Sequence, residues 1–547
     1  MGKNTLIIVE SSPKIDAIEK ILSDSELDKS LPNRDYIATN GHLFDLTNAD
    51  IGVSFSNSGN IILENVFING KYKLLEGLKN KAAQAGDIYI FTDADIEGER
   101  IAYDVVNYLI KTCNVEKNQI HRVVSSSITK KAVINAFLNC EKIDNTHKNK
   151  YVRAQSIRRA FDKLVGHVLS SLLLSQGYDK GLGRSQLAIL FSVNNIELIS
   201  YYDRKKEINI PLTIKGYSTD TGITVRTNTN YSLPTMYNIV SSASGNLFTT
   251  YQILQALYNK GCITYLRTKN ILMSEDYSDY LKAYNIKVPK SFIMPTDEAI
   301  TAHEGLRFTL EFIELFREYY ESGKLIDFFE DYDIVIKNKT SLYELIHIIS
   351  LYSYLNKFKN LPYIEVYNNL SDIIEHLTIY YSFDDFDIDN NLKSNKVTSL
   401  RDLFFVSDFF SICTPSSFFS IVEKTISKYF KIDFSSNGLI LNNEGEELVE
   451  LIKNKVDISS FYFPYFKYVL YEKILNKEES EIEDTDLDIL QEILNFYNIT
   501  LQLDSNKHKI NNISIKQSTS HEIDSKINNM LLEHGDIIDD TIYKAEI

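Results

Sequence analysis

The sequence predicts that the chain opens with an α/β domain, in which helices flank a parallel sheet, and continues with mostly α-helical and mixed domains. Two short apolar runs, residues 6–9 and 88–91, have the length of buried strands, and each is followed by a turn and by apolar residues at helical spacing. A third unit repeats this order from Val123 and Val124 to a helix cap at Thr129. Strands that alternate with helices in this way favour a parallel sheet covered by helices.

Acidic residues follow the first two predicted strands. Glu10 comes directly after residues 6–9, and Asp93, Asp95 and Glu97 follow residues 88–91 in a D-x-D-x-E pattern. Acids after a strand are common helix caps, but four carboxylates that converge at one sheet edge would repel one another without a cation. Mg²⁺ suits such a site because it prefers oxygen ligands, keeps several waters and often bridges to phosphate. We therefore expect Mg²⁺ as the cofactor, with these four residues as its ligands.

Length and composition limit the class of protein. The chain has 547 residues, 44% of them apolar, so three or four domains are expected. No export signal and no apolar stretch of membrane-spanning length is visible, which predicts an intracellular, cytoplasmic protein without a membrane partner. The four cysteines stand far apart without a C-x-x-C pair, which excludes a zinc ribbon and argues against a disulfide framework: Cys113, Cys140, Cys262 and Cys413.

The charge is strongly acidic, with a formal net value of −16. Such a balance argues against nonspecific binding to duplex DNA, which depends on Lys and Arg, so any nucleic-acid role needs a local basic channel. Much of the acidity begins at residues 477–484. We expect residues 471–547 to form an acidic C-terminal extension, either a solvated helix face or a mobile tail.

The motifs of the first domain resemble a known family. Residues 8–14, which carry Val-Glu-Ser-x-x-Lys, the Gly-His and Asp-Leu pairs at 41–46, and the acidic run at 93–99 together look like the Toprim domain of type IA DNA topoisomerases. The chain departs from that pattern at Ile96, where the family usually has Arg. This change weakens phosphate contact at that position but not metal binding.

A candidate nucleophile lies in residues 261–268, which read Gly-Cys-Ile-Thr-Tyr-Leu-Arg-Thr and resemble the type IA active-site motif. The resemblance implies that Tyr265 attacks a phosphate, although in a chain with 35 tyrosines any single one is more often a packing residue. A phenol with a pKa near 10 needs a nearby cation to attack at neutral pH, and Arg267 can supply it and grip the phosphate. Lys14 adds a second positive contact, and Glu10, if neighbouring acids raise its pKa, is the candidate general acid for the departing 3′ oxygen.

The remaining motif matches concern the substrate strand. Residues 302–307 resemble a family segment in which His303 contacts the phosphate, and a buried structural histidine is the open alternative. Residues 153–166 resemble the helix that lines the family's single-strand groove, and residues 181–186 resemble its Gly-Arg-x-Gln loop. We expect the DNA-binding residues to be His42, Arg153, Arg158, Arg159, Asp162, Leu182, Gly183, Arg184, Ser185, Gln186 and Arg307.

The resemblance implies a ring of domains. Residues 1–150 would be the Toprim domain, 151–205 plus 400–470 the strand-binding domain, and 206–234 plus 360–399 a shortened arch, while 235–359 would be the mobile domain that carries Tyr265. It also implies a monomeric, ATP-independent enzyme that prefers single-stranded segments of negatively supercoiled DNA, cleaves one strand as a 5′-phosphotyrosine ester, passes a strand and religates. No Walker loop is present, which agrees with that expectation. Two alternatives remain open: another Toprim enzyme, such as a primase or a nuclease, and a noncatalytic single-strand-binding relative.

Overall fold

We analysed a computed structural model of the chain. It describes residues 4–12, 14–48, 50–93, 95–125, 128, 130–143, 150–178, 181–193, 195–203, 208–214, 235–236, 239–240, 243, 247–266, 268, 272–283, 288–294, 304–314, 345–346, 348–349, 392–410, 412–413, 415–433, 438–456, 461, 465–504, 506 and 508–515. Within these residues, every helix is too short or too polar to span a lipid bilayer.

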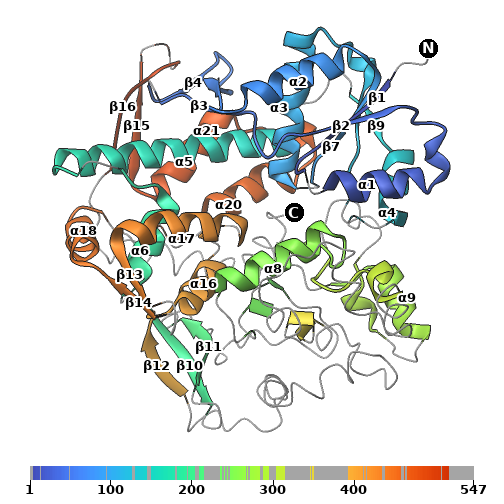
Figure 1. The fold of residues 1–547 in the computed structure, drawn as a ribbon. Coiled ribbons are helices and arrows are strands. Elements are labelled where there is room, and N and C mark those ends of the chain that lie inside the picture. Colours follow the sequence, from blue (N-terminus) through green and yellow to red (C-terminus); the bar gives the residue numbers. More distant parts are fainter. Residues whose placement is uncertain are drawn as a thin grey trace.

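The first domain is the predicted α/β unit (Figure 1). Its five-stranded sheet has the order β2-β1-β7-β8-β9, in which β1, β2, β7 and β8 run parallel and β9 is an antiparallel edge. The third strand ends before Val123, whose buried backbone nitrogen still donates to Ile90 O at 2.9 Å. The sheet elements and their flanking helices are β1 (Asn4–Val9), α1 (Lys14–Ser23), β2 (Arg34–Ala38), α2 (Tyr72–Ala82), β7 (Ala85–Phe91), α3 (Ile96–Cys113), β8 (Ile120–Arg122), α4 (Lys130–Leu138) and β9 (Glu141–Lys142).

Two small hairpins extend this domain between β2 and α2. They pair β3 (Phe44–Leu46) with β6 (Asn65–Phe67) and β4 (Val53–Phe55) with β5 (Ile61–Leu63). The second pair reaches away from the sheet and packs against helix α5 (Lys150–Ser175).

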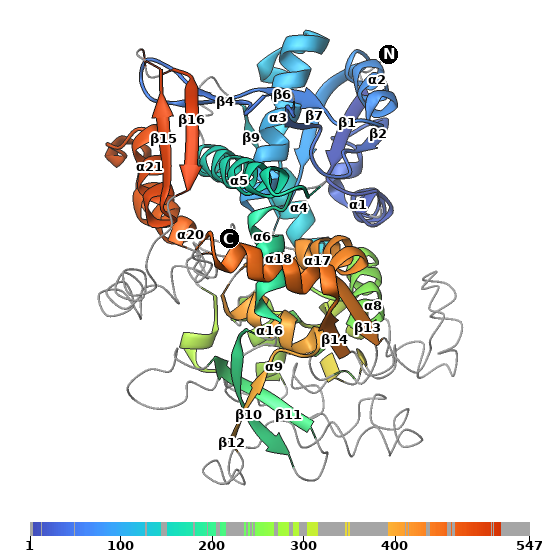
Figure 2. The ribbon, with the colours of Figure 1, turned by 90° about the vertical axis from the view of Figure 1, so that its left-hand side faces the viewer.

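Helix α5 joins the first domain to the rest of the molecule. Its 26 residues carry a continuous buried face that packs on α3, on α6 (Arg184–Ser192) and on the C-terminal part of the chain. Segments from 400 onward return to α6 and enclose it: α16 (Leu400–Phe409), α17 (Pro415–Tyr429), β13 (Phe430–Asp433), β14 (Gly438–Leu441) and α18 (Asn443–Lys453). Below them, a three-stranded antiparallel sheet is formed by β11 (Ile208–Ile214), β10 (Glu197–Asp203) and β12 (Leu392–Lys396), as Figure 2 shows. The domain boundaries themselves stay a prediction, and most of 206–234 and 360–399 lies outside the described residues.

The C-terminal segment differs from the expectation of a solvated face or a mobile tail, since its described part, up to residue 515, is folded. Helices α20 (Tyr465–Leu470) and α21 (Asp486–Phe496), with the π-helical turn η7 (Tyr471–Leu475), lead to a hairpin of β15 (Ile499–Leu503) and β16 (Ile510–Ile515). Helix α21 buries Ile489, Leu490, Ile493 and Leu494, and it packs on α5. The acidic composition of this segment suggested solvation, but its acids cap helices and form ion pairs while the apolar face of α21 packs on α5.

The segment with the candidate tyrosine follows helix α8 (Leu247–Asn259). Isolated bridges join Ile263 to Phe308 and Met273 to Ile293, and α9 (Glu275–Ala283) packs beside them. This unit contacts the first domain at the start of α4, where Lys130 N donates to Glu311 Oε1 at 3.1 Å and Lys131 pairs with Asp276 at 2.7 Å.

Candidate active site

Two of the predicted acids meet at the carboxyl edge of the sheet. Glu10 follows β1 and Asp93 follows β7, and these strands are parallel neighbours that pair Val9 with Phe91. The strand ends therefore lie side by side, and the backbone nitrogen of Asp93 donates to Glu10 Oε2 at 3.3 Å. Parallel pairing thus brings together two carboxylates that are 83 positions apart in the sequence.

Lys14 lies against this pair. Its ammonium forms an ion pair with Asp93 and faces the ring of Tyr258, with Nζ 5.6 Å from the ring centroid. The side chain is buried, which alone would lower the pKa of Lys14, but Asp93 and then Tyr258 and Glu10 raise it above its ordinary value. Lys14 is therefore a permanent positive charge at the edge of the sheet.

The environment of Glu10 favours its protonated form. Burial, and after it the charge of Asp93, raises the pKa of Glu10 to about 8, with a smaller contribution from Asp95 and an opposing one from Lys14. A carboxyl group with this pKa can hold a proton at neutral pH and release it during a reaction. This is the property that the sequence analysis required of a general acid.

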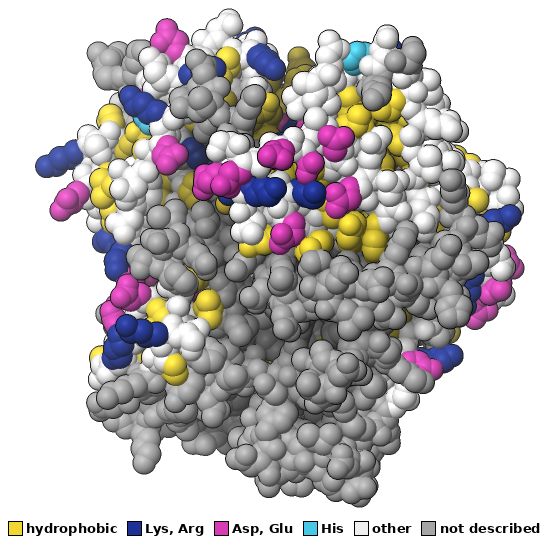
Figure 3. Space-filling model, turned by 180° about the vertical axis from the view of Figure 1, so that it is seen from behind, with side chains coloured by type: hydrophobic (Ala, Val, Ile, Leu, Met, Phe, Trp, Pro, Cys, Tyr) yellow, Lys and Arg dark blue, Asp and Glu magenta, His cyan; other side chains and the backbone are white. Residues whose placement is uncertain are grey.

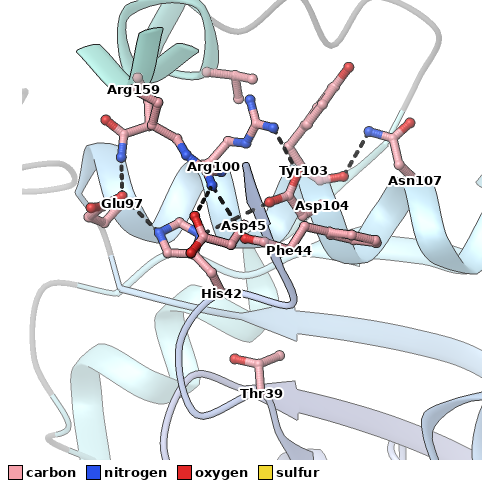
Figure 4. Close-up of polar contacts among 12 residues, drawn as sticks. Thr39, His42, Phe44, Asp45, Glu97, Arg100, Tyr103, Asp104, Asn107 and Arg159 are labelled. Atoms are coloured by element: carbon pink, nitrogen blue, oxygen red, sulfur yellow. Dashed lines mark hydrogen bonds and ion pairs between the residues drawn. The ribbon is translucent and has the colours of Figure 1, made fainter. Parts of the chain in front are cut away.

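Asp95 and Glu97 begin helix α3 in two different roles. The Asp95 side chain caps the helix and accepts from Gly98 N at 2.6 Å. A Cβ on Gly98 would lie 2.1 Å from the carbonyl oxygen of Asp93, so only glycine allows the turn that places these acids. Glu97 points toward α5, where His42 Nε2 lies 3.1 Å from Glu97 Oε2 and the Gln155 side chain donates to the same oxygen, and Figure 4 shows Glu97 beside His42.

Charges around Glu97 keep it ionised. Burial alone would raise its pKa, but the hydrogen bond from His42 and the charges of Arg158 and Arg159 lower the pKa of Glu97 to about 2. Two of the four acids thus differ in protonation. Glu10 can hold a proton at neutral pH, whereas Glu97, which is turned toward α5, stays ionised.

The oxygen donors at the sheet edge fit Mg²⁺ by their chemistry. Glu10 and Asp93 adjoin each other, and Asp95 is close enough to raise the pKa of Glu10. Mg²⁺ is often held by one or two carboxylates together with water and substrate phosphate, so this set suffices. Among the described residues, no group of three or more Asp, Glu, His or Cys side chains is placed to hold a metal ion, and Glu97 is bound to His42 and Gln155 instead.

Tyr265 lies one aromatic ring away from this site. Its side chain is buried, and its ring meets the ring of Tyr258 edge to face, with centroids 5.4 Å apart and planes at 77°. Tyr258 lies on α8 and is the residue whose ring faces Lys14. A chain of contacts therefore connects Tyr265 through Tyr258 and Lys14 to Asp93. The other two catalytic candidates, Arg267 and His303, lie outside the described residues.

The predicted DNA contacts on α5 are engaged with neighbouring segments. Arg153 pairs with Asp486 of α21 at 2.5 Å and donates to the carbonyl of Asp484 at 2.6 Å. Arg159 donates to the carbonyl of Phe44 at 3.3 Å. These two side chains hold the helix to its surroundings.

Arg158 occupies a different position. It lines a pocket between the start of α3, α5 and α20, which also includes Glu97, Gln155 and Lys467. Its guanidinium is 3.9 Å from Asp162 Oδ2, which is a long ion pair. Of the arginines predicted on this helix, Arg158 is the one that faces a pocket beside the acids.

The loop that precedes α6 joins α5 to the returning segment. Arg184 is buried, pairs with Asp162 at 2.8 Å and stacks 4.6 Å from the ring centroid of Phe466, and it donates to the carbonyl of Ile412 at 3.2 Å. Ser185 donates to that same carbonyl at 3.1 Å, and Gln186 accepts from Gly183 N at 3.0 Å. Leu182 is buried. The loop is thus anchored by its own side chains.

Arg307 is a structural residue in this arrangement. Its guanidinium makes a two-pronged ion pair with Glu304 at 2.9 and 2.8 Å and lies 4.2 Å from the ring centroid of Tyr277. It also donates to the carbonyl of Phe308 and to Ser274 Oγ. The side chain is 3% exposed and does not present a surface to a strand.

Several residues of the site carry no sequence motif that would identify them. Tyr258 was one of 35 tyrosines and had no motif to mark it, and Asp104 and Lys467 stand in the interior of helices. Gln155 belongs to the Arg-Ala-Gln segment of α5, and its place in that matched segment was the one sequence signal that could have identified it as a site residue.

The described part of the rear face carries charges of both signs (Figure 3). Figure 3 shows the rear face, on which acidic and basic side chains alternate in the described part and no broad basic stripe forms. The mixture of charges on this part of the face agrees with the net charge of −16.

Comparisons with known proteins identify the first domain. Residues 5–128 match the family model of the Toprim domain. DNA topoisomerase 1 of Campylobacter jejuni is 35% identical over 222 residues, which are 40% of this chain and 28% of that protein. DNA topoisomerase 1 of Mycoplasmoides gallisepticum is 31% identical over 217 residues, 36% of this chain and 28% of that protein.

Two further similarities extend along most of the chain. Reverse gyrase 2 of Sulfolobus acidocaldarius is 25% identical over 589 residues, 90% of this chain and 50% of that protein. The chain thus spans half or less of the length of these curated relatives. The solved structure of full-length topoisomerase I from Thermotoga maritima matches 90% of this chain and 89% of that chain, with a TM-score of 0.55 and 20% identity, so the two share a fold. Residues 5–128 are therefore a Toprim domain, and the chain is a homologue of the type IA DNA topoisomerase 1 proteins.

Proposed function

We propose that the chain is an ATP-independent DNA topoisomerase that cleaves one strand, holds its 5′ end as an ester on Tyr265, passes a strand and religates, and so relaxes negative supercoils. The observation that carries the proposal is the line of contacts from Tyr265 through Tyr258 to Lys14 and Asp93, which brings a phenol close to a carboxylate site. The proposal includes a monomer that acts inside the cell on single-stranded segments of supercoiled duplex.

The cleavage step exchanges one phosphoester for another. The phenolic oxygen of Tyr265 forms a bond to phosphorus while the bond from phosphorus to the 3′ oxygen breaks, and the phenolic proton passes to solvent. The 3′ oxygen takes a proton from Glu10, whose raised pKa keeps that proton available at neutral pH. Glu10 takes the proton back during religation.

Positive charge stabilises the phosphate while it reacts. Lys14 is fixed beside Asp93, and Arg267 and His303 are proposed to grip the phosphate from the segments that follow Tyr265. Mg²⁺ held by Glu10, Asp93 and Asp95, with Glu97 as a further proposed ligand, would neutralise charge on the substrate strand. Strand contacts are proposed for Arg158 and for its neighbours on α5.

The decisive experiment replaces Tyr265 with Phe, which keeps the buried ring and removes the nucleophile. We expect Tyr265→Phe to abolish both the relaxation of negatively supercoiled DNA and the covalent adduct. Tyr251→Phe is the matched control, because Tyr251 lies on helix α8, which precedes the segment of Tyr265, and its ring stacks on Phe419 with centroids 4.0 Å apart. It should relax DNA like the parent chain.

Other outcomes would favour the alternatives. Cleavage or synthesis that persists in Tyr265→Phe without attached protein would indicate a primase or a nuclease that uses metal-activated water. Binding of single strands by the parent chain, without any Mg²⁺-dependent nicking, would indicate a noncatalytic relative.

A further inference from the structure

Six side chains form a polar circuit between α3 and α5 that has one open contact. The circuit begins at Gln155 of α5 and ends at the next residue of that helix, Ser156. In order, its members are Gln155, Glu97, His42, Asp104, Arg100 and Ser156. Figure 4 shows its central part, with His42 between Glu97 and Asp104. Because both ends of the circuit lie on α5, its contacts link His42 and the acids of α3 to that helix.

The contact between His42 and Asp104 is incomplete. His42 Nδ1 lies 4.0 Å from Asp104 Oδ2, which is beyond hydrogen-bond distance, and neither atom has a hydrogen-bond partner among the described residues. Buried polar atoms without partners are unfavourable. If the imidazole moves a short distance away from Glu97 and carries its proton on Nδ1, that nitrogen donates to Asp104 Oδ2, and both atoms gain a partner.

Asp104 cannot move to meet the imidazole. It is held by Arg100 at 3.1 Å, with both side chains 5% exposed, and Arg100 in turn donates to Ser156 Oγ of α5 at 2.8 Å. The Asp104 carboxylate is therefore held in place by Arg100. His42, whose side chain is 25% exposed, is the member of the pair that has room to move.

Glu97 is the member of the circuit that a metal would compete for. Its carboxylate is bound to His42 and Gln155 while Glu10 and Asp93 adjoin each other at the sheet edge. If Glu97 turns to join these acids, both His42 and Gln155 lose a partner, and Gln155 Oε1 already has none.

We propose that Asp104 is a positioning residue that takes His42 when Glu97 leaves it for the metal, so that the metal site is completed without leaving His42 unpaired. The inference rests on the proposed function only in the identity of the metal. It adds that Gln155, released by the same movement, is free to bond the strand along α5, so strand and Mg²⁺ favour the same arrangement.

The test measures Mg²⁺ binding without catalysis. In a Tyr265→Phe background, the rise of the unfolding temperature is followed against Mg²⁺ concentration at constant ionic strength, with and without a single-stranded oligonucleotide. We expect Asp104→Asn to raise the Mg²⁺ concentration for half of the full rise by about 10-fold, as loss of an outer partner of a metal ligand typically does. The Arg100→Met, Asp104→Leu double variant leaves no unpaired buried charge. It should also raise the Mg²⁺ concentration that gives half of the full rise.

A matched control exists in the same sheet. His121 and Asp87 form a second histidine–carboxylate pair at 3.0 Å, away from the acids, so Asp87→Asn should leave the Mg²⁺ response unchanged. An unchanged or lower half-effect concentration in Asp104→Asn, or no Mg²⁺ response in the parent background, would overturn the inference. Failure of the proposed function is detected separately. In that case the parent chain, which has Tyr265, forms no covalent adduct with DNA, while Mg²⁺ still raises the unfolding temperature.

Discussion

Each half of the site is a packed, hydrogen-bonded unit, whereas the described contacts between the halves include exposed side chains. On the Toprim side, Glu10 and Asp93 are fixed by parallel strands whose core residues are buried. On the tyrosine side, Thr264 exchanges hydrogen bonds with the backbone of Arg307, and Thr309 N donates to Cys262 O at 3.0 Å. Across the boundary, Lys131 pairs with Asp276 at the surface and Lys130 N donates to Glu311, while Lys14 faces the ring of Tyr258. An exposed ion pair contributes little to the boundary, which agrees with the proposed passage of a strand between the two halves.

The largest effect is expected inside the tyrosine half. Arg307→Ala leaves Glu304 buried and unpaired, and breaking a buried pair in this way costs about 3–5 kcal/mol of stability. Urea unfolding would show this loss. If stability is unchanged while DNA affinity and its salt dependence fall, Arg307 is a strand contact, as the sequence resemblance implied, and the tyrosine half is less tightly packed than we describe.

The next effect probes the Toprim half. Lys14→Met removes the charge that pairs with Asp93, and we expect adduct formation to slow by about 10²–10³-fold, the usual loss for one stabilising donor. Single-turnover cleavage of a labelled oligonucleotide measures it. Lys20→Met is the control, because Lys20 lies on the same helix and is exposed. A Lys14 variant as fast as this control would remove Lys14 from the mechanism.

A smaller effect concerns the pH dependence of the same half. Glu10 has a pKa of about 8 in the folded chain against an ordinary value of 4.5, so the folded state binds its proton more tightly than the unfolded state does. Its contribution to stability is fully present below pH 4.5 and is lost as the pH rises through about 8. Thermal unfolding in EDTA should therefore show a decline over this range that Glu10→Gln reduces. Equal slopes for both chains would contradict the assignment.

The smallest effect lies at the boundary. Lys131 and Asp276 are 67% and 48% exposed, so their pair contributes at most about 1 kcal/mol. A double-mutant cycle with Lys131→Ala and Asp276→Ala should find a coupling of this size or less, and it should shrink with added salt. A much larger coupling would mean that the two halves are held firmly together.

The fold and the acids were predictable for a physical reason. Strand, turn and helix are local patterns, and parallel pairing alone brings Glu10 and Asp93 to one edge. The direction of Glu97 was not predictable, because it depends on His42 and Gln155, which reach it from a distant loop and from α5. Likewise, the pairing of Arg153 and the burial of Arg184 and Arg307 depend on partners such as Asp486, Asp162 and Glu304, which a single-sequence pattern does not mark.

The C-terminal segment illustrates the same limit. Its charge predicts solvation, yet Asp486 accepts from Arg153 and from Ile61 N at 2.9 Å, and α21 covers α5 with its apolar face. Charge composition describes the outer side of a helix and carries no information about the face that packs.

The most direct test of the account is to locate the covalent bond. The parent chain is incubated with a labelled single-stranded oligonucleotide and Mg²⁺, the reaction is quenched with denaturant, and the modified peptide is identified by mass spectrometry. The account predicts a 5′-phosphoryl ester on Tyr265. An ester on another residue, or cleaved DNA with no attached protein, would contradict it.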